Sequence, residues 1–137
     1  MMLVDSNIVF AVLVHGMPWH GAARELHGLD KDWRTESHAL VEISNVLSRY
    51  VRARELSGVK AVALMSEADQ RMRPRMLTVD HAEALRVAIK YTVSAYDARF
   101  LLCASELGVK LVTEDVKLRK AAPALTQSVQ DAIASRN

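Results

Sequence analysis

The sequence contains a single cysteine, Cys103, among its 137 residues. One cysteine excludes a disulfide framework, and a free thiol on the apolar side of a helix fits a reducing compartment. No apolar run approaches the ~20 residues that a membrane-spanning helix requires, and residues 1–10 lack the basic start of a signal peptide. We therefore expect a cytoplasmic protein that has no membrane partner.

Glycine-rich phosphate-binding patterns are also missing. The five glycines form neither a Walker A nor a dinucleotide-binding pattern, which argues against nucleotide-binding folds of those kinds. No repeat, low-complexity tract or linker interrupts the chain, so we expect one domain over residues 1–137, long enough to bury a core. The formal charge of +2 is too small to indicate a class of partner.

Two short apolar segments each run directly into an acidic residue that precedes a helix. The first is Met2–Val4, followed by Asp5 and by one or two helical turns. The second is Val109–Thr113, followed by Asp115 and a helix that starts near residue 116. Because ligands bind beyond the carboxyl ends of strands in open α/β sheets, both acids are candidate site residues.

Further strands are predicted at Trp33–Thr35 and Met76–Val79, and a short strand and a helix in the tail Ala124–Asn137. Because helical segments alternate with these strands, the pattern predicts a parallel α/β sandwich. Right-handed crossovers bring the carboxyl ends of parallel strands to one edge, so Asp5 and Asp115 should share it.

Two more acids lie on predicted helices. Asp97 is in the first turn of a helix that Ser94 precedes and Gly108 ends, and Glu42 borders the apolar face of another helix. Each acid also has a structural interpretation. The spacing of Ser94 and Asp97 resembles a capping box, Asp115 or its neighbour could cap the next helix, and Glu42 could pair with a basic residue.

A cluster of these acids would be costly unless their pKa values rise or a cation binds among them. Their ligand atoms are all oxygen, and no histidine or cysteine stands at a suitable spacing beside them. Such a set indicates a hard cation such as Mg²⁺, with Mn²⁺ as a substitute, rather than zinc.

Four motifs in this order resemble the PIN-domain ribonucleases of the VapC toxin type. They are LVDSN over residues 3–7, VEISNVL over 41–47, YDARFL over 96–101 and LVTEDVKL over 111–118. Each motif alone is weak, but the four together span most of the chain at the separations typical of the family. The resemblance implies a PIN-like α/β/α sandwich with a mostly parallel central sheet of four to five strands, built from a single PIN domain over residues 1–137.

The resemblance also implies a metal-dependent endoribonuclease that hydrolyses RNA phosphodiester bonds with a metal-activated water. The implied catalytic and metal-binding acids, which would hold one or two Mg²⁺ or Mn²⁺ ions, are Asp5, Glu42, Asp97 and Asp115. Asn7 and Thr113 are interpreted as hydrogen-bond donors that orient these carboxylates, with helix capping as an alternative for Thr113.

The implied partners are an RNA substrate, a second copy in a homodimer and a small antitoxin that covers the acidic cleft. The antitoxin is expected to lie near Ile8, Val12 and the helix face around Val46. Alternatives are a housekeeping PIN nuclease in RNA processing, or a non-catalytic RNA- or protein-binding module whose acids only cap helices. A haloacid-dehalogenase-type phosphatase is excluded because Asn7 stands where its second aspartate should be.

Three groups of basic residues could follow the phosphates of an RNA, although a solvated surface is the more common explanation for any one of them. They are Arg71, Arg73 and Arg75, which would share one side of an extended chain, Arg49 and Arg52 on one helix face, and Lys117, Arg119 and Lys120 beside Asp115. Trp19, Trp33 and Tyr96 are interpreted as core or interface residues rather than as platforms for base stacking. Residues Ser57–Met72 are predicted to form an amphipathic helix whose apolar residues are Val59, Val62, Ala63, Leu64 and Met65.

Overall fold

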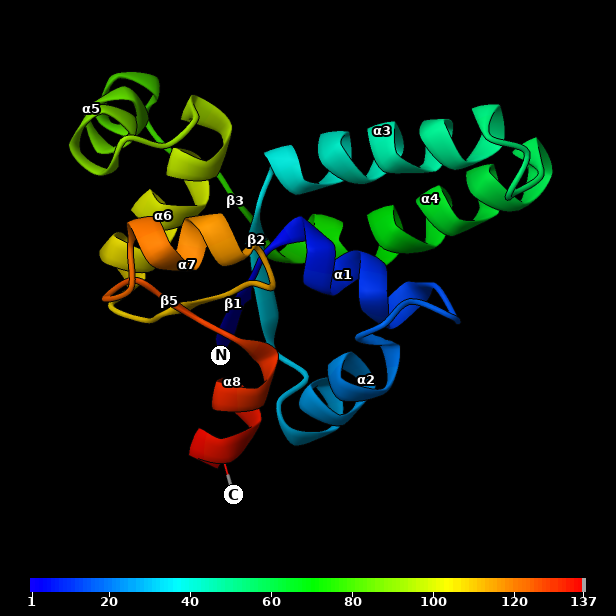
Figure 1. Ribbon diagram of the computed structural model, residues 1–137, viewed down its shortest axis with the longest axis horizontal. Coiled ribbons are helices and arrows are strands. Elements are labelled where there is room, and N and C mark those ends of the chain that lie inside the picture. The colour runs from blue at the N-terminus through cyan, green and yellow to red at the C-terminus, as the bar shows by residue number, and fades with distance from the viewer. Residues whose placement is uncertain (137) are drawn as a thin grey trace.

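A five-stranded parallel sheet lies at the centre of the protein, between helices on both faces (Figure 1). The computed structural model describes residues 1–136. The strands are β1 (Met2–Val4), β2 (Trp33–Glu36), β3 (Met76–Leu77), β4 (Leu111–Val112) and β5 (Thr126–Gln127). They follow the order β3-β2-β1-β4-β5, and every neighbouring pair is parallel. The predicted α/β/α sandwich is therefore confirmed.

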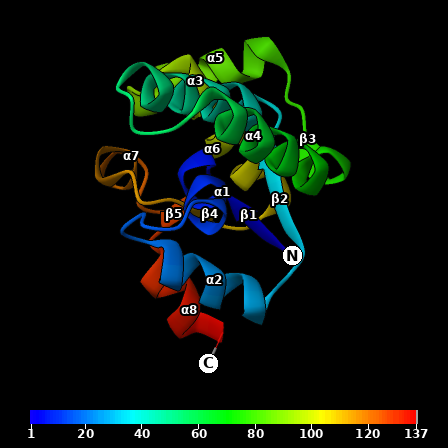
Figure 2. The same cartoon turned by 90° about the vertical axis from the view of Figure 1, so that its right-hand side faces the viewer.

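Eight α-helices and one short 3₁₀ helix connect the strands within residues 1–136. They are α1 (Ser6–Leu13), α2 (His20–Leu29), α3 (His38–Arg52), α4 (Gly58–Met72), the 3₁₀ helix η1 (Arg73–Arg75), α5 (His81–Tyr91), α6 (Ala95–Leu107), α7 (Val116–Ala121) and α8 (Val129–Arg136). Helices α3 and α4 form an antiparallel pair that extends away from the sheet (Figure 1). Helices α2 and α8 pack together at the opposite end of the molecule (Figure 2). None of the helices in the described part of the chain is long and apolar enough to cross a membrane.

The first strand explains how the sheet separates two hydrophobic cores. Side chains alternate between the faces of a strand, so Met2 and Val4 point to one side and Leu3 to the other. Met2 and Val4 pack into the core that α1, α2, α3, α4 and α8 share, whereas Leu3 packs against α6. All three side chains are buried. Because both faces are covered, β1 is apolar throughout, as expected for a central parallel strand.

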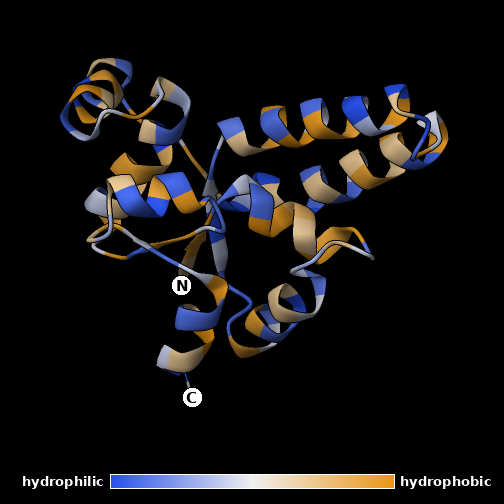
Figure 3. Cartoon of the chain, viewed as in Figure 1, coloured by the Kyte–Doolittle hydropathy of each residue, from blue (hydrophilic) through white to orange (hydrophobic). Residues whose placement is uncertain are grey.

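Helix α4 forms as predicted, but its buried face matches the prediction only in part, because Leu64 and Met65 pack against the core and the two valines do not. Val59 and Val62 are 86% and 68% exposed, whereas Ala61, Ala68 and Met72 are buried. Hydrophobic and hydrophilic residues alternate around the turns of α3 and α4 (Figure 3). The prediction gave weight to the bulkier valines, but small alanines on the facing side allow two helices to approach closely.

The predicted extended display of three arginines is wrong. Helix α4 continues to Met72, and the next three residues, with Pro74 at their centre, form η1. Proline suits the first turn of such a helix because its φ angle is already fixed near the helical value. Arg73 pairs with Asp69, and Arg75 donates to Asp32 at 2.8 Å, so both guanidinium groups have carboxylate partners within the domain.

The ends of the predicted elements differ slightly from those observed. The strand expected over Val109–Thr113 is reduced to two residues, because Gly108 ends α6 with a positive φ of 67° and the chain must first turn toward the sheet. The predicted terminal helix ends at Arg136, and Asn137 lies outside the described residues.

Candidate active site

The strand order changes direction at β1, and this places a crevice at the carboxyl edge of the sheet between β1 and β4. The chain proceeds from β1 to β2 and β3 on one side, and β4 and β5 lie on the other. Asp5 directly follows β1, and Thr113 to Asp115 directly follow β4. Ligands bind at such a switch point in open α/β sheets, so both predicted strand-end acids lie where a site is expected.

Asp5 is the most deeply buried of the four acids, at 5% exposure. Its Oδ1 accepts the backbone N–H of Ser6 at 2.7 Å, and its Oδ2 accepts the Thr113 hydroxyl at 2.7 Å. Burial raises its pKa to about 7, with further increases from the charges of Glu42 and Asp97, although the two hydrogen bonds act in the opposite direction. Asp5 therefore caps α1 and is also a carboxyl group that retains a proton easily.

Asn7 and Thr113 connect the two sides of this crevice, at the ends of β1 and β4. The Asn7 side-chain amide donates to Thr113 Oγ1 at 3.2 Å and to Asp5 Oδ2 at 3.4 Å. The Thr113 hydroxyl oxygen also accepts the backbone N–H of Asp115 at 3.1 Å. The Asn7 amide oxygen accepts the N–H of Glu114 at 3.3 Å. Thr113 thus orients Asp5 and fixes the turn that precedes α7, but it does not cap that helix, whose N-cap is Asp115.

Glu42 reaches the same edge of the sheet from the second turn of α3. The Ser6 hydroxyl donates to Glu42 Oε2 and also lies 3.3 Å from Asp5 Oδ1, so this small side chain bridges two acids. His38, one turn earlier on α3, holds its Nε2 3.9 Å from Glu42 Oε1. Its imidazole stacks on the Tyr96 ring, with centroids 4.8 Å apart.

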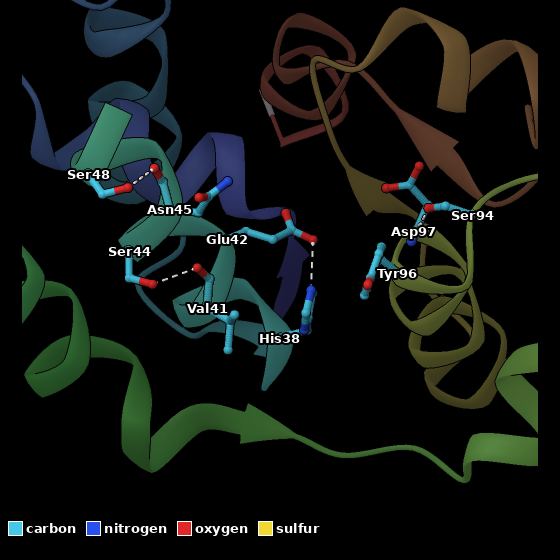
Figure 4. A pocket seen from close by; sticks show the side chains of 9 residues that line it. All are labelled: His38, Val41, Glu42, Ser44, Asn45, Ser48, Ser94, Tyr96 and Asp97. Atoms are coloured by element: carbon cyan, nitrogen blue, oxygen red, sulfur yellow. Dashed lines mark hydrogen bonds and ion pairs between the residues drawn. The ribbon is translucent and has the colours of Figure 1, made fainter. Parts of the chain in front are cut away.

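Asp97 faces Glu42 across a cavity of about 760 Å³ (Figure 4). Ser94 caps α6 by accepting the backbone N–H of Asp97 at 3.0 Å. The predicted cap is therefore present, but it uses the backbone of Asp97 and leaves the carboxylate directed toward the cavity. In residues 1–136, the Asp97 carboxylate has no hydrogen-bond partner.

Burial, and after it the repulsion between neighbouring acids, raises the pKa values of Asp5, Glu42 and Asp97. The pKa of Glu42 is raised by burial and by the charges of Asp97, Glu36 and Asp115, against the opposing effect of the Ser6 hydroxyl. The pKa of Asp97 is raised by burial and by Asp115. These four acids therefore interact with one another. A cation placed among them would offset both the repulsion between the carboxylates and the cost of burying their charges.

Asp115 and Glu114 have different roles despite being neighbours. Asp115 Oδ1 accepts the backbone N–H of Leu118 at 3.1 Å and so caps α7. Glu114 turns away, accepting the N–H of Val129 at 2.8 Å and pairing with Arg119 at 3.2 Å. Asp115 is therefore the one of the two acids that remains near Glu42 and Asp97.

Three residues near this edge have contacts that sequence reasoning missed. Ser6 was part of a recognised motif, but nothing in the sequence shows that its hydroxyl joins two acids. Glu36, the last residue of β2, is fully buried and accepts the N–H of His38 at 2.7 Å. Ser37, the N-cap residue of α3, makes no side-chain capping bond, and the Glu36 carboxylate accepts the first N–H of that helix instead. The strand-then-acid pattern that identified Asp5 would also have identified Glu36.

The donor set fits a hard divalent cation in its chemistry, since all four side chains offer carboxylate oxygens. No three His, Cys, Asp or Glu side chains within residues 1–136 are already grouped so that they could hold a metal ion. The acids come from four separate elements and repel one another, so an ion would have to draw their side chains together. Carboxylates that repel one another are expected to stay apart until a cation binds between them.

Comparison with known proteins gives a consistent picture. The fold is similar to that of PAE2754 from Pyrobaculum aerophilum, with a TM-score of 0.76 and 20% identity, over 98% of this chain and 88% of that one. It is also similar to FitAcB from Neisseria gonorrhoeae, with a TM-score of 0.63 and 17% identity, over 93% and 96% of the two chains. No curated protein matches the sequence significantly. Residues 2–123 match the PIN domain. The chain therefore belongs to the PIN domain family.

Proposed function

We propose that the protein is a metal-dependent endoribonuclease whose acids are Asp5, Glu42, Asp97 and Asp115. PIN domains are generally nucleases. The observation that supports the proposal most is the position of these acids: Asp5 and Asp115 follow the two strands at the switch point of the sheet, Ser6 joins Asp5 to Glu42, and Asp97 faces Glu42 across the cavity. Three of them have raised pKa values, and residues with such values in a cleft are typical of functional sites.

The chain's own side chains would bind and orient the reacting groups. The four acids would hold Mg²⁺ or Mn²⁺, which when bound polarises a phosphate and lowers the pKa of an attacking water. Thr113 and Asn7 hold Asp5 in place, and Ser6 holds Glu42. The RNA backbone would enter the cavity of about 760 Å³ between Glu42 and Asp97.

Three basic side chains that could contact the RNA are exposed and are not used in ion pairs within residues 1–136. They are Lys117 on α7, and Arg49 and Arg52 in the last turns of α3. Arg119 instead donates to the Thr113 carbonyl at 2.7 Å and pairs with Glu114, so it stabilises the turn after β4. We therefore expect phosphate contacts from the first three residues.

The experiment that tests the proposal is incubation of the purified protein with total cellular RNA. Cleavage is expected with Mg²⁺ or Mn²⁺ and should stop when a chelator is added. RNA that stays intact under all of these conditions would contradict the proposal and favour a non-catalytic binding module.

Divalent ions are expected to raise the melting temperature of the protein. The four ligands are distant in sequence, so an ion binds the folded chain and not the unfolded one. Mn²⁺ at a hundred times its dissociation constant would stabilise the fold by roughly 2.7 kcal/mol, which corresponds to about 8 °C for a domain of this size. Differential scanning fluorimetry measures the shift. A melting temperature that millimolar Mn²⁺ leaves unchanged would argue against the metal site.

We also infer that the protein is the toxin of a toxin–antitoxin pair, as the VapC-type motifs imply. A metal-free group of carboxylates is a suitable receptor for an arginine, whose planar guanidinium can bridge two acids. The expected apolar contact surface must be corrected, because Ile8 is fully buried. A groove beside Glu42 is lined by Phe10, Trp19 and Val46 among others, and Trp19 is 40% exposed.

Co-expression with an adjacent small gene is expected to yield a stable complex with suppressed nuclease activity. Replacing the antitoxin arginine that enters the acidic cleft with alanine should restore cleavage more than it weakens binding, because the apolar contacts remain. Cleavage assays and a binding titration on the same complex measure the two effects. If no such gene exists, or its product does not bind, a housekeeping PIN nuclease becomes the better description.

A homodimer is expected to form through one apolar face of α3, α5 and α6. Val41, Leu85 and Tyr96 line a shared depression there, and their exposed fractions are 57%, 54% and 62%. Tyr96 is therefore not a core residue. Exposed apolar patches of this kind often mark protein interfaces. Leu85→Glu should shift the protein from dimer to monomer in light scattering, while a dimer that persists in this variant would place the interface elsewhere.

A further inference from the structure

A buried ion pair lies beside the proposed active site but belongs to none of its four acids. Glu36 is the last residue of β2 and its side chain is completely buried. Its Oε1 accepts Arg99 Nε at 3.0 Å and Arg99 Nη2 at 2.8 Å, and also the Ser37 hydroxyl at 2.9 Å. Its Oε2 accepts the backbone N–H of His38. Both carboxylate oxygens are thus occupied, so Glu36 is not free to act as a fifth ligand.

Arg99 connects this carboxylate to two helices. It lies on α6, and its Nη1 is 3.1 Å from Nδ1 of His81 at the start of α5. The hydrogen bonds to Glu36 raise the pKa of Arg99, so the guanidinium stays charged. A planar guanidinium that contacts one carboxylate through two nitrogen atoms fixes orientation as well as distance.

The ion pair links α6 to the end of β2, and the same Glu36 carboxylate also holds the start of α3. Glu36 holds the first N–H of α3, which carries Glu42 one turn later. Arg99 is two residues after Asp97 on α6. Glu42 and Asp97 are like charges on opposite sides of one cavity, so their repulsion would tend to separate α3 from α6 (Figure 4). The contact of Arg99 with Glu36 ties α6 to the point where β2 leads into α3, and it opposes that separation.

We propose, on the basis of the proposed function, that the Glu36–Arg99 pair is a positioning element that sets the distance between Glu42 and Asp97. Glu36 and Arg99 touch neither the ion nor the RNA. They keep the two acids at a separation that one ion or one pair of ions can bridge. Carboxylates held at a spacing suited to the ion bind it more tightly and align the phosphate better.

The test compares three variants with the wild-type protein. Glu36→Gln with Arg99→Met removes both charges together and so leaves no unpaired charge buried. Arg99→Lys keeps the charge but replaces the planar two-nitrogen contact with a single ammonium. Glu83→Gln with Arg86→Met is the matched control, because it removes an exposed ion pair within α5. Mn²⁺ binding is measured by calorimetry, and kcat and KM by RNA cleavage, at a temperature at which circular dichroism shows each variant folded.

For the double variant at Glu36 and Arg99, we expect Mn²⁺ affinity to fall by roughly 10- to 100-fold. The kcat should fall by a similar factor, with KM for RNA changed by less than about threefold. The control should match the wild type. A pair that only supports the fold would lower the melting temperature and leave Mn²⁺ affinity and kcat unchanged, and that result would overturn the inference.

Arg99→Lys decides the question if the double variant does not fold. We expect an intermediate loss of Mn²⁺ affinity, about 3- to 10-fold, and unchanged affinity would overturn the inference. Failure of the proposed function is distinguishable, because the wild-type protein itself would then neither bind Mn²⁺ nor cleave RNA.

Discussion

Asp97→Asn is expected to reduce RNA cleavage by at least about 10³-fold while the fold remains intact. The substitution preserves the size of the side chain and the Ser94 cap, which uses the backbone N–H of residue 97. It removes one negative charge from a group of acids that repel one another, so the metal-free protein should be equally stable or slightly more stable. The measurements are cleavage rate in Mn²⁺ and melting temperature in chelator.

Asp5→Asn is expected to give the same loss of cleavage. Glu106→Gln is a suitable control for both substitutions, because this exposed acid lies near the end of α6. Cleavage at the wild-type rate in either variant would refute the assignment of these acids. A large fall in melting temperature would instead support the view that the acids serve only to cap helices.

The stability of the metal-free protein is expected to decrease as the pH rises from about 4 to 7. The pKa of Asp5 is raised from 3.8 to about 7 in the folded protein. Between these values the folded state binds a proton that the unfolded state has lost, so the free energy of unfolding falls with increasing pH. A difference of about three pKa units corresponds to roughly 4 kcal/mol. Burial of Glu42 and Asp97 acts in the same direction.

Chemical denaturation across this pH range isolates the contribution of Asp5. Asp5→Asn cannot lose a proton there, so its stability should change less with pH than that of the wild type. The difference between the two proteins gives the contribution of the single carboxyl group. Parallel curves for the two proteins would show that Asp5 has an ordinary pKa and would remove the electrostatic argument for a cation at this position.

Much of the fold follows from local pattern, because strands and helices alternate and the two strands that precede Asp5 and Asp115 are short and apolar. Asp5 and Asp115 could be placed from this pattern alone, since right-handed crossovers bring strand ends to one edge. The same rule applied to β2 would have identified Glu36. Its burial and its pairing with Arg99 could not be predicted, because 63 residues separate the two partners in the chain and only the packing of α6 against β2 brings them together.

The orientation of α4 shows where periodicity is insufficient. Val59 and Val62 have the spacing of a buried face, yet Ala61 and Ala68 occupy it. Both faces of α4 carry apolar residues, so the face that is buried depends on how closely α3 approaches. That distance is set by tertiary packing and cannot be read from the local sequence. The acids illustrate a related point, since Asp5 and Asp115 cap helices and also face the site. Capping a helix therefore does not exclude either acid from the proposed site.

The most direct test of the account is a calorimetric titration of Mn²⁺ into the wild-type protein and into four variants. The variants are Asp5→Asn, Glu42→Gln, Asp97→Asn and Asp115→Asn, with Glu106→Gln as the control. If the four acids form one metal site, the wild type and the control should bind Mn²⁺ with the same affinity. Each of the four variants should then bind at least about 10-fold more weakly. Wild-type protein that takes up no Mn²⁺, or variants that bind it as tightly as the wild type, would contradict the account.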